Sequence, residues 1–281
     1  MSNSSSEADD PLSPPWGRLD LPPGDDRAVG LGPLELRLRR AGEELWIARR
    51  WTREPPTAAV ETGGGKVPAG AEEEAEPEWS RWAVPEGTTG VRLDPVFPDR
   101  PLVVEPEQTF HLVRGARVRV YVRVPLWVSV ALTEPSKVSL VEIPTHILSD
   151  TWFGDFAEGE LAYALPTSAR REISPEIFAL HLAICPLVLG NDAVDHLEVK
   201  KLCLRVSHLS VFARGPELWS DETRVRYQGE DQESQIRISG KVPSEAPDAE
   251  RVMPPREPPA RGFRARTFAR LADLSGLGAS W

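Results

Sequence analysis

Hydrophobic and polar residues alternate along much of the middle of the chain. The stretch ARVRVYVRV, residues 116–124, places a valine at every second position between arginines and a tyrosine. The stretch ELRLRR, residues 35–40, repeats this pattern with leucines. A period of two is typical of a strand with one buried face and one wet face, as in antiparallel sheets. Further segments with strand character are 45–51, 79–84, 102–104, 109–113, 126–132, 137–143, 159–165, 176–184, 196–206, 209–214, 223–228 and 234–239.

Short strands at regular spacing predict an all-β protein, built as an antiparallel sandwich or as barrel-like sheets. No long segment has a period of 3.6 until the C-terminal end. There Phe268, Leu271 and Leu274 fall near helical spacing within residues 261–281, which predicts a short amphipathic helix. Its basic end could contact an anionic partner or a membrane surface. The alternatives are a helix folded back onto its own sheet, or a frayed end.

Composition divides the chain into segments. Residues 1–28 are rich in Ser, Asp and Pro and predict a disordered N-terminal tail. Residues 54–78 contain three consecutive glycines and a glutamate run without periodicity, which predicts a flexible insert. Residues 241–281 begin as a Pro-rich tail. The β-rich region leaves two organisations open, one domain over 29–240, or two packed β units over 29–113 and 114–240.

Charge and cysteine content narrow the partners and the compartment. The chain has 33 Lys and Arg against 43 Asp and Glu, a formal net charge of −10. Binding to a nucleic-acid backbone needs clustered basic residues, so no nucleic acid is expected as a partner. Two cysteines cannot form a disulfide framework and favour a reducing compartment. The polar N-terminus lacks a secretory signal and the apolar stretches are too short to span a bilayer, which predicts a soluble, cytoplasmic protein.

Motifs for cofactors and metals are weak in this sequence. TGGGKV, residues 62–67, lacks the hydroxyl residue, the helix and the clear preceding strand of a phosphate-binding loop, so we interpret it as a linker. Cysteines and histidines gather between residues 181 and 208, but their spacing on strands does not converge as a tetrahedral zinc site requires. We therefore predict no metal and no cofactor.

The most suggestive stretch for chemistry is SDTWFGDFAEGELAYAL, residues 149–165. It joins an aromatic pair and a Gly-Asp turn to a group of carboxylates, which are side chains suited to ligand binding, acid–base work or a cation. The alternative is a hairpin whose aromatic pair caps the core, and whose acids are neutralised at the surface by Arg170 or Arg171. The candidate ligand-binding residues are Trp152, Phe153, Asp155, Glu158, Glu160 and Arg170.

Several segments together resemble domain-of-unknown-function family 432. They are TWFGDFAEGELAYAL (151–165), TSARR (167–171), CPLVLGN (185–191), LEVKKLCLRV (197–206) and LWSDETRVRYQG (218–229). The resemblance covers about residues 29–240, and TWFGD followed closely by GEL is its most specific part. It implies a β-rich domain found largely in prokaryotes, and it supplies no established catalytic residues.

The favoured function from sequence is a non-catalytic binding or accessory module, with an unknown protein or small molecule as its partner. The continuous set of strands, without a recognisable nucleophile, base and orienting group, motivates this interpretation. One alternative is a carboxylate- or metal-dependent enzyme centred on residues 151–160. Another is a structural subunit that pairs with a partner through an edge strand.

Overall fold

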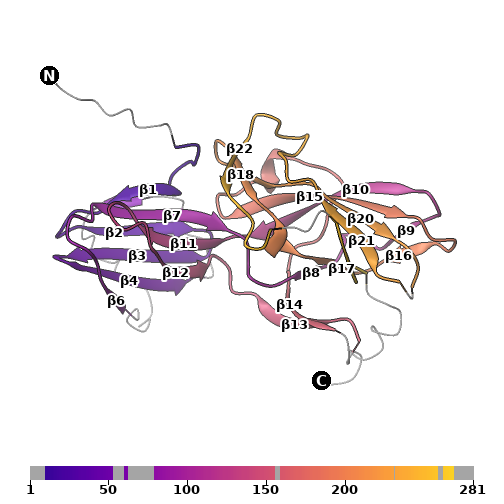
Figure 1. Cartoon of the computed structure of the whole chain (residues 1–281), viewed down its shortest axis with the longest axis horizontal. Helices are drawn as coiled ribbons and strands as arrows, with labels where there is room; N and C mark the ends of the chain where they lie inside the picture. Colours follow the sequence, from indigo (N-terminus) through magenta and orange to yellow (C-terminus); the bar gives the residue numbers. More distant parts are fainter. Residues whose placement is uncertain are drawn as a thin grey trace. The chain divides into compact units, whose positions relative to one another are not determined.

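The computed structural model describes residues 10–52, 60–62, 79–155, 159–230, 232–258 and 262–268. The protein is all-β, as the alternating pattern predicted, and most of its strand pairs are antiparallel (Figure 1). Within these residues the helical elements are two single-turn 3-10 helices, η1 Pro175–Ile177 and η2 Val206–His208. No helix in the described part of the chain is both long enough and apolar enough to cross a bilayer.

The strands belong to two compact units that exchange the chain three times. The first unit contains the residues up to Val96 and the segment Leu126–His146. The second unit contains Phe97–Pro125 and the residues from Ile147 onward. Because the segment from Phe97 to Pro125 leaves the first unit and the chain then returns to it, neither unit is continuous in sequence.

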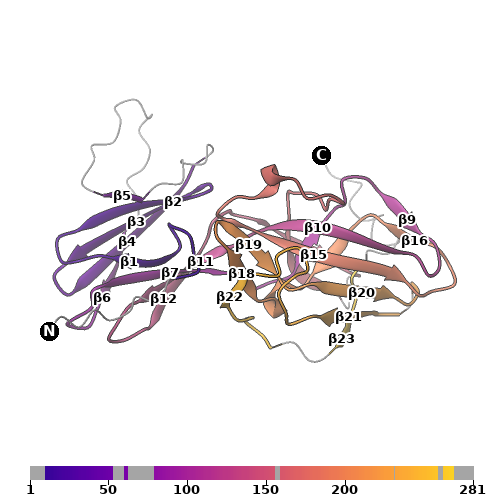
Figure 2. The same cartoon turned by 90° about the horizontal axis from the view of Figure 1, so that it is seen from above.

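The first unit has two antiparallel sheets, which Figure 2 shows as two layers. One sheet has the order β5-β2-β3-β4-β6 and the other has the order β1-β7-β11-β12. The strands are β1 Gly17–Asp20, β2 Asp26–Leu31, β3 Leu34–Ala41, β4 Glu44–Trp51, β5 Val60–Thr62, β6 Trp79–Ala83, β7 Gly90–Val96, β11 Trp127–Leu132 and β12 Ser139–Pro144.

Alternation along each strand builds the core of the first unit. Leu34, Leu36 and Leu38 of β3 are fully buried, whereas the residues between them reach the surface or ion pairs. Gly90 begins β7, where a Cβ atom would lie 2.3 Å from the carbonyl oxygen of Leu19. Only glycine therefore allows β1 and β7 to approach this closely.

The second unit contains an eight-stranded sheet with the order β22-β18-β19-β15-β20-β21-β23 and with β10 paired to β15 (Figure 1). A four-stranded sheet, β13-β14-β8-β17, and a two-stranded sheet, β16-β9, complete its described strands. The strands are β8 Leu102–Val104, β9 Phe110–Leu112, β10 Arg117–Pro125, β13 Ser149–Phe153, β14 Glu160–Ala164, β15 Leu182–Asn191, β16 Leu197–Val199, β17 Leu202–Leu204, β18 Val211–Arg214, β19 Glu217–Ser220, β20 Thr223–Tyr227, β21 Ser234–Ile238, β22 Glu250–Met253 and β23 Phe263–Ala265.

Strand β15 is the centre of the large sheet. Its residues are almost all buried, as expected of a strand covered on both faces. Along one edge it pairs antiparallel with the whole of β10. Along the other edge it pairs in parallel, first with β19 and then with β20. This arrangement puts Arg123, Ile184 and Trp219 side by side in one row across three strands.

Two sequence predictions about where strands lie differ from the structure. Residues 17–20 and 26–31 are strands that pair with β7 and β3, so the predicted disorder of 1–28 is wrong for this part. The predicted strand 176–184 begins only at Leu182, because η1 begins at Pro175, whose ring fixes φ at a value that suits the start of a helical turn.

The predicted C-terminal helix is not supported. Phe263–Ala265 form β23, which pairs with β21. The hydrogen bonds available at the edge of the sheet therefore determine the secondary structure of these residues. Phe268 is buried and bridges to Leu202. The rest of that prediction, residues 269–281, lies outside the described residues, as do residues 1–9 and most of the predicted insert 54–78. Within that insert, Val60–Thr62 form β5.

Candidate functional site

The sequence-predicted site lies on the hairpin of β13 and β14. Phe153 is 4% exposed and packs with Ala162 and Cys203 in a small core cluster. Its neighbour Trp152 points to the other face of the strand and is 52% exposed. The Trp152 indole N–H donates a hydrogen bond to the carbonyl oxygen of Asp155, at 2.9 Å, which closes the turn. The aromatic pair therefore does not cap the core together: one ring is buried and the other is on the surface.

The acids of this stretch are neutralised separately. Asp155 forms an ion pair with Arg266 at 2.8 Å, and Glu160 forms one with Arg205. Arg170 lies elsewhere, at the edge of β10, so it is not the partner that the sequence suggested. Arg171 forms no ion pair with either acid. Glu158 lies outside the described residues.

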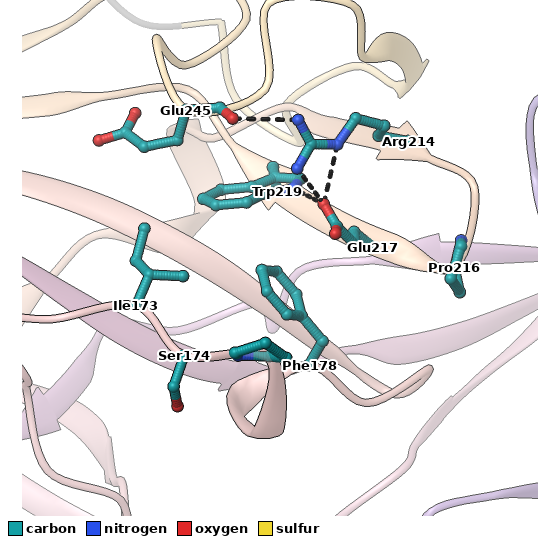
Figure 3. A pocket seen from close by; sticks show the side chains of 9 residues that line it. Ile173, Ser174, Phe178, Arg214, Pro216, Glu217, Trp219 and Glu245 are labelled. Atoms are coloured by element: carbon teal, nitrogen blue, oxygen red, sulfur yellow. Dashed lines mark hydrogen bonds and ion pairs between the residues drawn. The ribbon is translucent and has the colours of Figure 1, made fainter.

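A pocket of about 400 Å³ lies in the second unit, against one face of the large sheet. We call it the Trp219 pocket (Figure 3). One wall is the segment before β15, which includes η1, and the other is the β18–β19 hairpin. Its lining residues are Ile173, Ser174, Pro175, Phe178, Arg214, Pro216, Glu217, Trp219 and Glu245. The residues of the sequence-predicted site are not among them.

Two aromatic rings form the apolar part of the pocket. Trp219 is held at the floor by its pairing with Ile184 on β15 and with Phe212 on β18, and it is 1% exposed. The Phe178 ring lies 5.4 Å from the Trp219 ring, tilted by 57°. This distance and tilt are in the range favoured by aromatic pairs, so the two rings support one another. Figure 3 shows Ile173 facing the same hollow from the opposite wall.

The charged residues of the pocket bind each other. Arg214 donates to Glu217 Oε2 from Nε at 2.9 Å and from Nη2 at 2.6 Å. The same oxygen accepts the indole N–H of Trp219 at 3.2 Å. Arg214 Nη1 donates to the backbone carbonyl of Glu245 at 3.1 Å. The hairpin creates this arrangement, because its register places Arg214 directly opposite Glu217.

Glu245 belongs to a second network beneath the pocket. Its Oε1 accepts the Tyr121 hydroxyl at 2.8 Å and also pairs with Arg119. Burial alone would raise the pKa of Glu245, but the hydrogen bonds from Tyr121 and Arg119 outweigh it and lower that pKa. The hydrogen bond to Glu217 raises the pKa of Arg214. Both groups thus hold their charges more firmly than free side chains do.

Thiol and metal chemistry have little support in the described residues. Burial raises the pKa values of both Cys185 and Cys203 to about 12, so neither thiol forms a thiolate near neutral pH. Within the ranges that the structure describes, no three His, Cys, Asp or Glu side chains gather in a way that could hold a metal ion.

Sequence reasoning missed this pocket, although part of it had a local signal. Gly215 and Pro216 lie between two short alternating segments, which is typical of a hairpin. Such a hairpin brings Arg214 near Glu217. The contribution of η1 and of Glu245 depends on contacts between distant segments, which the local pattern does not contain. The pocket residues that carry the charge and the rings are Phe178, Arg214, Glu217, Trp219 and Glu245.

Comparison with known proteins gives the family of the chain. Searches of curated proteins and of solved structures found no match. A family model described as "Protein of unknown function (DUF432)" matches residues 15–272, which is most of the chain and extends beyond the predicted 29–240 at both ends. The chain therefore belongs to the DUF432 family.

Proposed function

We propose that this chain is a non-catalytic binding module and that the Trp219 pocket holds its ligand. The observation that carries the proposal is that one pocket contains two aromatic rings and, beside them, the side chain of Arg214, whose charge is already neutralised by Glu217. Pockets of roughly 300–1,000 Å³ with apolar walls and a few fixed polar groups hold small ligands. A volume of about 400 Å³ fits a small planar or aromatic group.

The electrostatics of the pocket favour binding over acid–base catalysis. A general acid or base works best when its pKa lies near the operating pH. Here the pKa of Glu245 is lowered and the pKa of Arg214 is raised, and both shifts move away from neutrality. These groups are better suited to orient a ligand than to exchange protons with it.

A direct test uses indole as an aromatic probe and methyl glucoside as a polar comparison, with saturation-transfer NMR as the readout. Indole should give saturation transfer with the wild-type chain, and methyl glucoside should give little. The variant Phe178→Ala removes one ring and should lower the indole affinity at least about tenfold, since it removes an aromatic contact worth about 1 kcal/mol and also the apolar surface that indole would bury against the ring. Ser174→Trp, at the pocket edge, should block indole by filling the volume.

Trp152→Ala is the matched control, because it removes an exposed ring outside the pocket. It should leave indole binding unchanged. Indole binding that survives Phe178→Ala and Ser174→Trp, in variants that unfold at the wild-type temperature, would contradict the proposal. So would loss of binding in Trp152→Ala.

The other sequence-based functions stay predictions. An enzyme centred on 151–160 has less support, because Asp155 and Glu160 each lie with a separate arginine. Pairing through an edge strand would use an outer strand of a sheet, such as β13 or β17. A cytoplasmic location and a prokaryotic origin also stay predictions.

A further inference from the structure

Two arginines of the second unit lie close together without a carboxylate between them. Arg123 is on β10, on the same strand face as Tyr121 two residues earlier. Arg170 pairs directly with Tyr121 through two backbone hydrogen bonds, of 2.7 and 2.9 Å. Residues opposite each other in an antiparallel pair share a face, and diagonal neighbours are within reach of long side chains. Arg123 and Arg170 are such diagonal neighbours.

The hydrogen-bonding capacity of this pair is unused. Nε of Arg123 is buried and has no hydrogen-bond partner. Among the described residues neither the Arg123 nor the Arg170 guanidinium forms an ion pair. Burial and the neighbouring Arg170 lower the pKa of Arg123, with no acidic group acting in the other direction. A buried N–H group without a partner is costly, and native proteins usually satisfy such a group.

The same strand supplies an internal comparison. Arg119, two residues before Tyr121, pairs with both Glu222 and Glu245. Arginine therefore finds carboxylates readily on this face of β10, in a chain with ten more acidic than basic residues. The absence of any such partner for Arg123 and Arg170 in the described residues is a local exception. Guanidinium groups bind carboxylates and phosphates through paired N–H donors.

We propose that Arg123 and Arg170 form a binding site for a small oxyanion, with the chemistry of a phosphate or a carboxylate group. The anion accepts the unused N–H groups of both side chains and separates their like charges. The row of Arg123, Ile184 and Trp219 places this site on the same face of the large sheet as the Trp219 pocket. The proposal is independent of the pocket, since it uses none of the pocket residues.

The test is titration calorimetry of the full chain with inorganic phosphate, acetate or chloride at constant ionic strength. Phosphate or acetate should bind with saturation below about 10 mM, and the stronger of the two identifies the preferred anion. Arg123→Gln and Arg170→Gln should each weaken binding at least about tenfold, because each removes charge-assisted hydrogen bonds. Arg171→Gln is the matched control: it removes the same charge one residue further along, outside the bridge to Tyr121, and should change binding less than about twofold.

A thermal measurement separates binding from folding. Phosphate should raise the unfolding temperature of the wild type and of Arg171→Gln, but not that of Arg123→Gln or Arg170→Gln. Without phosphate, Arg123→Gln should unfold at or above the wild-type temperature, since it removes the unpartnered buried Nε–H and the like charge beside Arg170. Should Arg123→Gln fail to fold, the exposed Arg170→Gln carries the test alone. The proposal is overturned if neither oxyanion saturates the wild type, if chloride binds equally well, or if Arg170→Gln binds as the wild type does.

Discussion

At the scale of single residues, the carboxyl group of Asp221 is an unusual feature of the core. The residue is 1% exposed, in the turn between β19 and β20. Burial raises its pKa from 3.8 to about 6, although the backbone N–H of Ser210 donates to Oδ1 at 2.9 Å and partly offsets this. The native state therefore binds a proton that the unfolded state has already lost at mildly acidic pH.

The pH dependence of stability should reflect this group, and Asp221→Asn should remove the effect. Between about pH 4 and pH 6 the folded state holds the proton more tightly, so folding stability from this residue falls as pH rises. The difference between 3.8 and about 6 corresponds to a loss of about 3 kcal/mol. We expect the wild type to lose this stability relative to Asp221→Asn, measured by urea unfolding at several pH values.

The shape of the difference makes this prediction specific. The free energy of unfolding of the wild type minus that of Asp221→Asn should fall as the pH rises from about 4 to about 6. Above about pH 7 this difference should be constant. Asparagine keeps an oxygen that can accept the Ser210 N–H, so the packing around Oδ1 is conserved. Parallel pH profiles for the two proteins would contradict the prediction.

At the scale of elements, the β13–β14 hairpin separates two aromatic residues that are adjacent in sequence. Phe153→Ala should lower the free energy of unfolding by about 3 kcal/mol or more, because it opens a cavity in a buried cluster. Trp152→Ala should cost about 1 kcal/mol, because the ring is half exposed and loses mainly its contact with the turn. Urea unfolding of both variants measures the two values.

Leu161→Ala is the control for the exposed face. Leu161 lies directly opposite Trp152 and is also exposed. The loss of unfolding free energy in Leu161→Ala should resemble that in Trp152→Ala. A larger loss for Trp152→Ala than for Phe153→Ala would mean that the outer face of this hairpin is covered by something the described residues do not include.

The sequence predicted most of the elements but not their partners. Alternation located β3, β4, β10 and β11, since a period of two is a local property. The interpretation that both Trp152 and Phe153 cap the core did not apply this rule, which places adjacent strand residues on opposite faces but does not say which one is buried. The ion-pair partners of Asp155 and Glu160 could not be found by local reasoning, because they depend on how distant strands pair. Strand β14 pairs with β8, whereas Arg170 lies beside β10 and therefore away from both acids.

At the scale of the whole molecule, the sequence left one β domain or two packed β units open, and the structure contains two compact units that are each discontinuous in sequence. Strands β10 and β11 have the same alternation and are separated by Leu126 alone. Nevertheless β10 pairs with β15 in the second unit, and β11 pairs with β7 and β12 in the first. Pro125, which has no N–H to donate to a sheet ladder, stands at this change of unit. Two units divided between residues 113 and 114 cannot describe a chain that leaves the first unit and later returns to it.

Net charge supports one prediction about partners at this scale. With a formal charge of −10, the chain should repel duplex DNA, whose non-specific binding depends on many phosphate contacts. The proposed oxyanion site supplies two arginines, so at most about two phosphates could be neutralised there, giving a salt slope no steeper than about −2. Fluorescence anisotropy with a labelled duplex should therefore give a dissociation constant weaker than about 100 μM at physiological salt.

Two results would contradict this expectation. One is micromolar binding at physiological salt, and the other is a salt slope near −5, since either requires a basic surface that the charge balance does not indicate. The variant Arg123→Gln provides the control. If the wild type binds the duplex weakly at low salt and Arg123→Gln does not, the oxyanion site is the cause of that binding. This outcome is compatible with the prediction, because a site for a small anion can accept a single phosphate of the duplex. Small-anion binding and failure to bind DNA are thus the combined result expected of an acidic chain in which Arg123 and Arg170 lack a carboxylate partner among the described residues.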